Sequence, residues 1–122
     1  ICSGPPTMIP PYIEDLGFKT EYDINKAVKN ADVIMMLRIQ KERGGVSYIP
    51  SIKEYSTIYG LKTDHVKKAK KDVIIMHPGP MNRGVEITDE VADGPYSVIL
   101  DQVENGVAVR MAVLYLLIGG EA

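Results

Sequence analysis

The chain of 122 residues has very little of several residue types that carry common functions. Cys2 is its single cysteine, which excludes an internal disulfide framework and a cysteine-based zinc site. The two histidines give no metal-ligand spacing, and no apolar run approaches the roughly 18 residues that a membrane-spanning helix needs. A net charge of −2 provides no basic surface for nucleic acid or an acidic membrane. We therefore expect a soluble cytoplasmic protein with no nucleic-acid and no membrane partner.

Motifs for nucleotide and acyl-enzyme chemistry are also missing from the sequence. It contains no GxGxxG fingerprint, no Walker-type loop and no nucleophile elbow. We expect neither a cofactor nor a metal. The chain begins at Ile1 without an initiator Met, and its first residues are typical of the end of a strand. We expect a fragment of a longer protein, although its length suits one domain with a single core.

Two short apolar runs, 33–37 and 73–76, predict strands buried on both faces, as in a parallel sheet. Helical signals surround them. They predict a short helix through Leu16 closed by Gly17, a helix capped by Asp23, helices over 53–59 and from a Thr63 cap to the lysines at 67–71, and a long helix over about 96–118. The alternation indicates an α/β fold, a mainly parallel sheet with helices on both faces. The last helix carries more apolar surface than this chain can cover.

The loops that follow the two predicted strands hold the candidate site residues. Ligands of open α/β sheets bind beyond the carboxyl ends of the strands. Arg38 directly after the first strand is suited to bind a carboxylate, because its planar fork donates two parallel charge-assisted bonds. Gln40 can donate and accept beside it, and Glu42 could hold Arg38 from behind. An ordinary solvated charged loop is the alternative interpretation of this segment.

The second loop begins with His77-Pro78-Gly79-Pro80. Neither proline has a backbone N–H, so the run offers mainly carbonyls, which suit the NH₂ group of a small ligand. Gly79 allows close approach to the backbone, and the bond before Pro80 is a candidate for cis. A rigid structural turn is the alternative. His77 by itself is more typical of a structural histidine, His65 in a Lys-rich helix is expected at the surface, and Cys2 is expected to be buried.

Three segments occur together in an order and spacing typical of one enzyme family. They are 36–43 (MLRIQKER), 77–87 (HPGPMNRGVEI) and 102–111 (QVENGVAVRM). The chain closely resembles aspartate carbamoyltransferases over nearly its whole length. This resemblance implies transfer of the carbamoyl group of carbamoyl phosphate to L-aspartate, giving N-carbamoyl-L-aspartate and phosphate in pyrimidine biosynthesis.

The resemblance also implies roles for individual residues. Arg38 would bind an aspartate carboxylate with help from Gln40, and Glu42 would support Arg38. Backbone groups of Gly79 and Pro80 would hold the carbamoyl group after a cis bond. His77 and Arg110 would lie near the site without contacting the substrates.

By the same resemblance, residues 1–122 are the C-terminal L-aspartate-binding domain, and the helix over about 96–118 packs on an N-terminal carbamoyl-phosphate domain. That domain carries the phosphate loop and the polarising groups, so this chain alone should be inactive. The working form would be a homotrimer of catalytic chains, with a regulatory chain or a dihydroorotase as possible partners.

An ornithine-type carbamoyltransferase is the nearest rival, but it typically has a cysteine where this chain has the 77–80 turn. A non-catalytic aspartate-binding module is the rival outside the enzymes.

Overall fold

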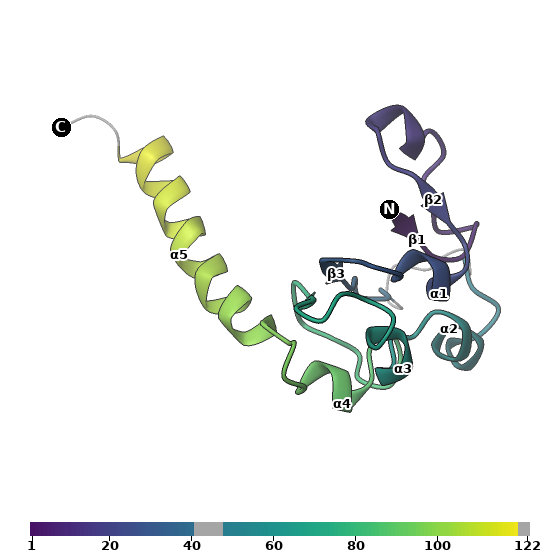
Figure 1. Cartoon of the computed structure of the whole chain (residues 1–122). Coiled ribbons are helices and arrows are strands. Elements are labelled where there is room, and N and C mark those ends of the chain that lie inside the picture. The colour runs from purple at the N-terminus through teal and green to yellow at the C-terminus, as the bar shows by residue number, and fades with distance from the viewer. Residues whose placement is uncertain (41–47, 120–122) are drawn as a thin grey trace.

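A computed structural model of the chain describes residues 1–40 and 48–119 (Figure 1). Its elements are all short except the last helix. In chain order they are β1 Cys2–Ser3, the 3₁₀ helix η1 Ile13–Leu16, β2 Thr20–Glu21, α1 Ile24–Ala27, β3 Val33–Met35, α2 Ile52–Ile58, α3 Thr63–Val66, β4 Ile74–Met76, α4 Asp89–Ala92 and α5 Ile99–Ile118.

The strands pair in parallel, which confirms the predicted α/β class. They form two separate two-stranded sheets, β1 with β2 and β3 with β4. In the second sheet Val33 lies opposite Ile74 and Met35 lies opposite Met76. On its other edge, β4 is joined by a parallel bridge from Ile75 to Ser97, just before α5. The β3–β4 pair therefore connects the middle of the chain to the last helix.

The hydrophobic core lies on one face of the β3–β4 sheet. Ile34 and Ile75 point into it, and the short helices α1, α3 and α4 supply Ile24, Val66, Val91 and Ala92. The members of this cluster are Ile24, Val28, Ile34, Leu61, Val66, Val73, Ile75, Ile87, Val91, Ala92 and Ile99.

The prediction that both strands are buried on both faces is wrong for this chain. Val33 is 49% exposed and Met35 is 47% exposed, whereas Ile34 between them is buried. Side chains alternate across a strand, so the two exposed residues lie on the face opposite the core. Within the described residues, no element covers that face enough to bury them.

Local signals near the N-terminus acted as predicted. Gly17 ends η1 with φ 85°, and its N–H donates to the Glu14 carbonyl oxygen. Asp23 caps α1 by accepting a hydrogen bond from the Asn25 N–H at 2.9 Å. Cys2, predicted to be buried, is half-buried.

The helix around His65 differs from the prediction. Thr63 is its first residue and Lys62 occupies the cap position, while the helix ends at Val66, before the run of lysines. His65 was expected at the surface but is buried, with its Nδ1 accepting a hydrogen bond from the Lys62 N–H at 3.2 Å. The prediction was based on the neighbouring lysines, which are indeed exposed. They lie beyond the end of the helix, whereas His65 itself lies on its buried side.

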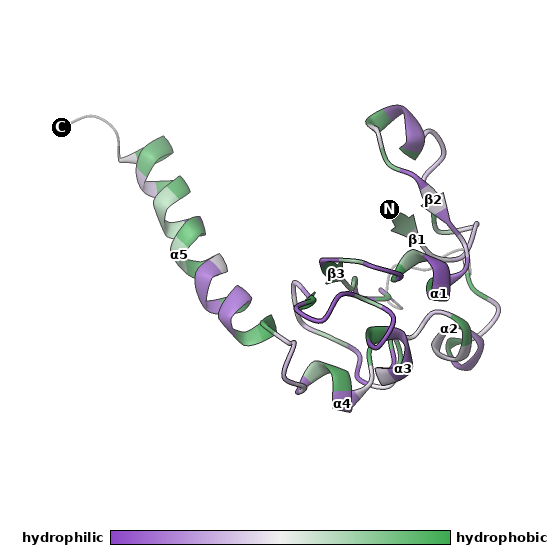
Figure 2. Ribbon diagram, viewed as in Figure 1, coloured by the Kyte–Doolittle hydropathy of each residue, from purple (hydrophilic) through white to green (hydrophobic). Residues whose placement is uncertain are grey.

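Helix α5 extends away from the rest of the molecule (Figure 1). It begins at Ile99, three residues later than predicted, and ends before Gly119. Its outer turns are strongly hydrophobic (Figure 2), and Leu116, Leu117 and Ile118 are each more than 70% exposed. The predicted excess of apolar surface on this helix is confirmed. No helix in the described ranges is long and apolar enough to cross a membrane.

Candidate functional site

The two predicted loops leave the same edge of the β3–β4 sheet. Met35 and Met76 end their strands opposite each other, and the Met36 N–H continues the ladder by donating to the Met76 carbonyl at 2.9 Å. Arg38 and Gln40 follow within a few residues on one side, and His77 follows directly on the other. The in-register parallel pair therefore brings the carboxylate-binding candidates to the same edge as the proline-rich turn.

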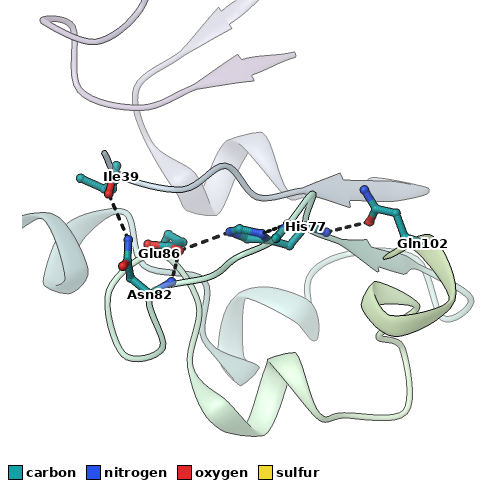
Figure 3. A network of polar contacts seen from close by, with 6 residues as sticks. Ile39, His77, Asn82, Glu86 and Gln102 are labelled. Atoms are coloured by element: carbon teal, nitrogen blue, oxygen red, sulfur yellow. Dashed lines mark hydrogen bonds and ion pairs between the residues drawn. The ribbon is translucent and has the colours of Figure 1, made fainter. Parts of the chain in front are cut away.

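A side-chain hydrogen bond connects these two loops. Asn82, in the loop after β4, donates through Nδ2 to the carbonyl oxygen of Ile39 at 3.0 Å (Figure 3). Ile39 is buried and lies between Arg38, which is half-buried, and Gln40, which is exposed. The third candidate of this segment, Glu42, lies outside the described residues.

The turn at 77–80 presents carbonyl groups almost exclusively. The Gly79–Pro80 bond is cis, as predicted, and Gly79 has φ 64°, in the left-handed region that favours glycine. The Gly79 N–H donates to Nδ1 of His77 at 2.9 Å. Because Pro78 and Pro80 have no N–H, this bond occupies the single backbone donor of residues 78–80. A ligand at this turn is therefore met by hydrogen-bond acceptors.

His77 is fully buried and its proton position follows from its contacts. Since Nδ1 accepts from Gly79, the proton of the neutral ring lies on Nε2, which donates to Oε1 of Glu86 at 3.2 Å. Glu86 is also fully buried. Its Oε1 accepts a second hydrogen bond from the backbone N–H of Asn82 (Figure 3).

The same network reaches α5. The backbone N–H of His77 donates to Oε1 of Gln102 at 3.0 Å, and Nε2 of Gln102 lies 3.9 Å from the Met35 sulfur. Gln102, Arg110 and Met76 line an open groove of about 740 Å³ between β4 and α5. Arg110 is exposed in this groove and is separate from the buried network.

Sequence reasoning assigned no role to Glu86, Asn82 or Gln102. A signal was present in Val85-Glu86-Ile87, where a single carboxylate stands between apolar residues directly after the turn. That pattern alone does not distinguish a buried acid from one that points to solvent.

Burial shifts one pKa near the site, and ion pairing shifts another at the surface. Burial, with a smaller contribution from the charge of Glu86, raises the pKa of Tyr55 in α2 to about 12, so this phenol stays protonated at neutral pH. On the surface of the loop after β4, Arg83 pairs with Asp93 and Asp89, and its guanidinium lowers the pKa of Asp93. Among residues 1–40 and 48–119, no cluster of three or more His, Cys, Asp and Glu side chains is arranged to hold a metal.

Comparison with known proteins decides the family. A family model described as "Aspartate/ornithine carbamoyltransferase, Asp/Orn binding domain" matches residues 13–117. The chain belongs to the aspartate/ornithine carbamoyltransferase family. The family predicted from the three segments is thereby confirmed.

Several carbamoyltransferases are similar to this chain. The aspartate carbamoyltransferase catalytic subunit of Syntrophotalea carbinolica is 65% identical over 118 residues, which are 97% of this chain and 38% of that protein. The corresponding subunit of Desulfosudis oleivorans is 60% identical over 121 residues, 99% of this chain and 39% of that protein. A solved ornithine carbamoyltransferase from Pyrococcus furiosus is 39% identical with a TM-score of 0.69, and the match covers 84% of this chain and 33% of that one. The chain thus spans about two fifths of the length of the curated carbamoyltransferases it matches.

Proposed function

We propose that this chain is the L-aspartate-binding part of an aspartate carbamoyltransferase. The enzyme would transfer the carbamoyl group of carbamoyl phosphate to the amine of L-aspartate, in pyrimidine biosynthesis. One observation carries the proposal: the loops that carry Arg38–Gln40 and the 77–80 turn leave one sheet edge and are joined by the bond from Asn82 to Ile39. The identity of 60% or more to aspartate carbamoyltransferase catalytic subunits supports aspartate as the acceptor.

The proposed division of roles follows from hydrogen-bonding capacity. Arg38 binds a carboxylate of aspartate through its two parallel N–H groups, Gln40 contacts the amino-acid end, and Glu42 holds Arg38 in place. The carbonyl groups at Gly79 and Pro80 accept from the NH₂ of the carbamoyl group. The loop after β3 thus offers donors to a carboxylate, and the loop after β4 offers acceptors to an NH₂ group.

The reaction itself requires groups beyond these two loops. The neutral amine of aspartate attacks the carbamoyl carbon, and phosphate leaves from the tetrahedral intermediate. Charge develops on the carbamoyl oxygen and on the departing phosphate, so both need hydrogen-bond donors or cations. The turn at 77–80 offers acceptors, so we assign the polarising donors to an N-terminal carbamoyl-phosphate domain.

The same proposal extends to the assembly. Residues 1–122 would be the C-terminal domain, with α5 packing on the carbamoyl-phosphate domain and Arg110 near the boundary between them. The working enzyme would be a cytoplasmic homotrimer of catalytic chains, with a regulatory chain or a dihydroorotase as candidate partners. The exposed apolar side chains of α5 support a domain contact there.

Phosphate release with L-aspartate and L-ornithine as separate acceptors tests this function. The assay uses this sequence joined to the remaining part that its relatives carry, for example that of the Syntrophotalea carbinolica protein. We expect activity with aspartate and none with ornithine. Activity with ornithine alone would assign the ornithine reaction, and no activity with either acceptor would favour a non-catalytic module.

Arg38→Ala tests the central binding role. Loss of the charge-assisted contact is expected to raise KM for aspartate on the order of 100-fold, because a hydrogen bond to a charged group contributes about 1.5–3 kcal/mol. KM for carbamoyl phosphate should change little. Arg83→Ala is the matched control, since Arg83 is an exposed arginine that pairs with Asp89 and Asp93. An unchanged KM for aspartate in Arg38→Ala would remove Arg38 from the site.

A further inference from the structure

We propose that Glu86 is a positioning residue that sets both halves of the proposed site at once. This inference rests on the proposed function. Its basis is the shared oxygen Oε1, which accepts from Nε2 of His77 and from the backbone N–H of Asn82 (Figure 3). One bond leads to the carbamoyl turn and the other to the aspartate loop.

The first branch controls the hydrogen-bond polarity of the turn. An acceptor at Oε1 keeps the His77 proton on Nε2, and the bare Nδ1 can then accept from the Gly79 N–H. A proton on Nδ1 would oppose the Gly79 donor and release it toward the ligand. Glu86 therefore keeps the turn a surface of acceptors, although it lies too deep to contact a substrate.

The second branch controls the position of the amino-acid loop. By accepting from the Asn82 backbone, Glu86 orients that residue, and the Asn82 side chain then holds the Ile39 carbonyl at 3.0 Å. Ile39 is the residue between Arg38 and Gln40, so its carbonyl anchors the peptide that carries both side chains. Glu86 itself is held by the Leu61 N–H, which donates to its backbone carbonyl at 2.9 Å.

A carboxylate at this place is unfavourable for stability alone. Glu86 is fully buried, and its second oxygen, Oε2, has no hydrogen-bond partner within residues 1–40 and 48–119. Burial of a polar atom without a partner costs free energy, and an apolar residue of similar volume would avoid that cost. The two bonds at Oε1 give a reason for a carboxylate here, because they link the loops that carry the proposed substrate contacts.

Variants in the joined catalytic chain separate the two branches. Asn82→Ala keeps the backbone N–H for Glu86 and removes the bond to Ile39, so KM for aspartate should rise about 5- to 10-fold while KM for carbamoyl phosphate stays within about 2-fold. Glu86→Ala should raise both KM values about 10-fold. Glu86→Gln keeps an oxygen that accepts the same two bonds and should restore both values to within about 3-fold. KM does not depend on the folded fraction of the enzyme, so a role in stability alone would leave it unchanged.

The matched control is Thr88→Val, a near-isosteric change in the same loop. The Thr88 hydroxyl is buried without a hydrogen-bond partner in the part of the chain that the structure describes, and we expect unchanged kinetics. Unchanged KM values in both Glu86→Ala and Asn82→Ala would overturn the proposal. So would an equal rise of both KM values in Asn82→Ala, or a failure of Glu86→Gln to restore what Glu86→Ala lost.

A measurement that does not depend on enzymatic activity distinguishes this inference from the proposed function. Nitrogen NMR of the His77 ring, assigned by its loss in His77→Asn, should show the proton on Nε2 and a bare Nδ1 at neutral pH. A proton on Nδ1 would overturn the positioning role even in an active enzyme. If the unmodified enzyme used neither acceptor, the proposed function would fail whatever the state of His77.

Discussion

Burial of His65 makes the stability of the fold depend on pH. Burial, followed by the charges of Lys62 and Lys68, lowers the pKa of His65 below its ordinary value of 6.5. The neutral ring accepts a hydrogen bond from the Lys62 N–H through Nδ1, and protonation would remove that acceptor. The folded chain therefore binds a proton at His65 less readily than the unfolded chain does.

The stability of the fold should consequently fall as the solution becomes mildly acidic. Between the folded pKa and 6.5 the unfolded state binds more protons, so the contribution of His65 is complete above about pH 6.5 and is lost as pH decreases toward the folded pKa. Urea unfolding from pH 7.5 to pH 5 should show this slope, and His65→Asn should flatten it. Asp64→Asn is the control: Lys67 lowers the pKa of Asp64 below 3.8, so that group titrates outside the window. An unchanged slope in His65→Asn would contradict this account.

The sequence predicted single-residue features correctly where they depend on local backbone conformation. Gly17, Asp23 and the bond before Pro80 were predicted correctly because their conformations depend on few neighbours. The burial of His65 and Glu86 was not predicted, because it depends on tertiary packing: α3 contacts α4, and the Glu86 backbone accepts a hydrogen bond from Leu61. The roles of Arg38 and Gln40 were inferred from their place after a predicted strand and from the family resemblance, and they stay predictions.

Among the elements, helix α2 is held close to the segment that carries Glu86. Gly60, just after α2, has no room for a side chain, because a Cβ there would lie 2.5 Å from the Ser56 carbonyl oxygen and 2.7 Å from that of Val85. Both neighbours are backbone atoms, which cannot rotate away. The approach brings Leu61 into its bridge with Ile87.

Gly60→Ala should therefore destabilise the fold by about 1–3 kcal/mol, as is typical of overpacking a closely packed site. The free energy of unfolding in urea measures this effect. Gly4→Ala is the control, because a Cβ at Gly4 would meet nothing within 4 Å. Equal stability of the two variants would mean that α2 can move away from Val85 without loss.

The elements themselves were largely predictable, and their ends were less so. The apolar runs at 33–37 and 73–76 marked β3 and β4, but each strand is three residues long and buried on one face. Helix α3 stops before the lysines, although lysine is a good helix former, since tertiary context decides where such a short helix ends. Propensity indicated the type of element, and packing determined its extent.

For the whole molecule, α5 is the part whose surroundings change most between this chain and the proposed enzyme. Its outer turns expose Leu116, Leu117 and Ile118, and packing against the described residues is concentrated near its start, at β4. An apolar helix without packing opens readily, because most helical stability comes from tertiary contacts.

Amide hydrogen exchange should therefore be fast over the second half of α5 in this chain alone and slow in the joined enzyme. The β4 segment is the internal control, since Ile75 is fully buried and should be protected in both forms. Similar protection of α5 in both forms would argue against the proposed domain contact.

The excess apolar surface of the last helix was visible in the sequence from its periodicity alone, and the structure confirms it. The spacing of apolar residues predicts an apolar face, but it does not identify the domain or protein that packs against that face. The carbamoyl-phosphate domain in this place stays a prediction.

The in-register pairing of β3 and β4 has a consequence for how specificity can change in such a fold. If the two strand ends carry the acceptor and the carbamoyl group, the spacing between the substrates is set by backbone hydrogen bonds rather than by side chains. A one-residue slip would shift one substrate against the other by about 3.3 Å, enough to separate the reacting atoms. Under that proposal, substitutions in the loop after β3 would leave this spacing intact while changing the contacts to the amino acid. Alignment of the reacting groups would then be set by the backbone of the paired strands, and the choice of acceptor by the side chains of the loops that follow them.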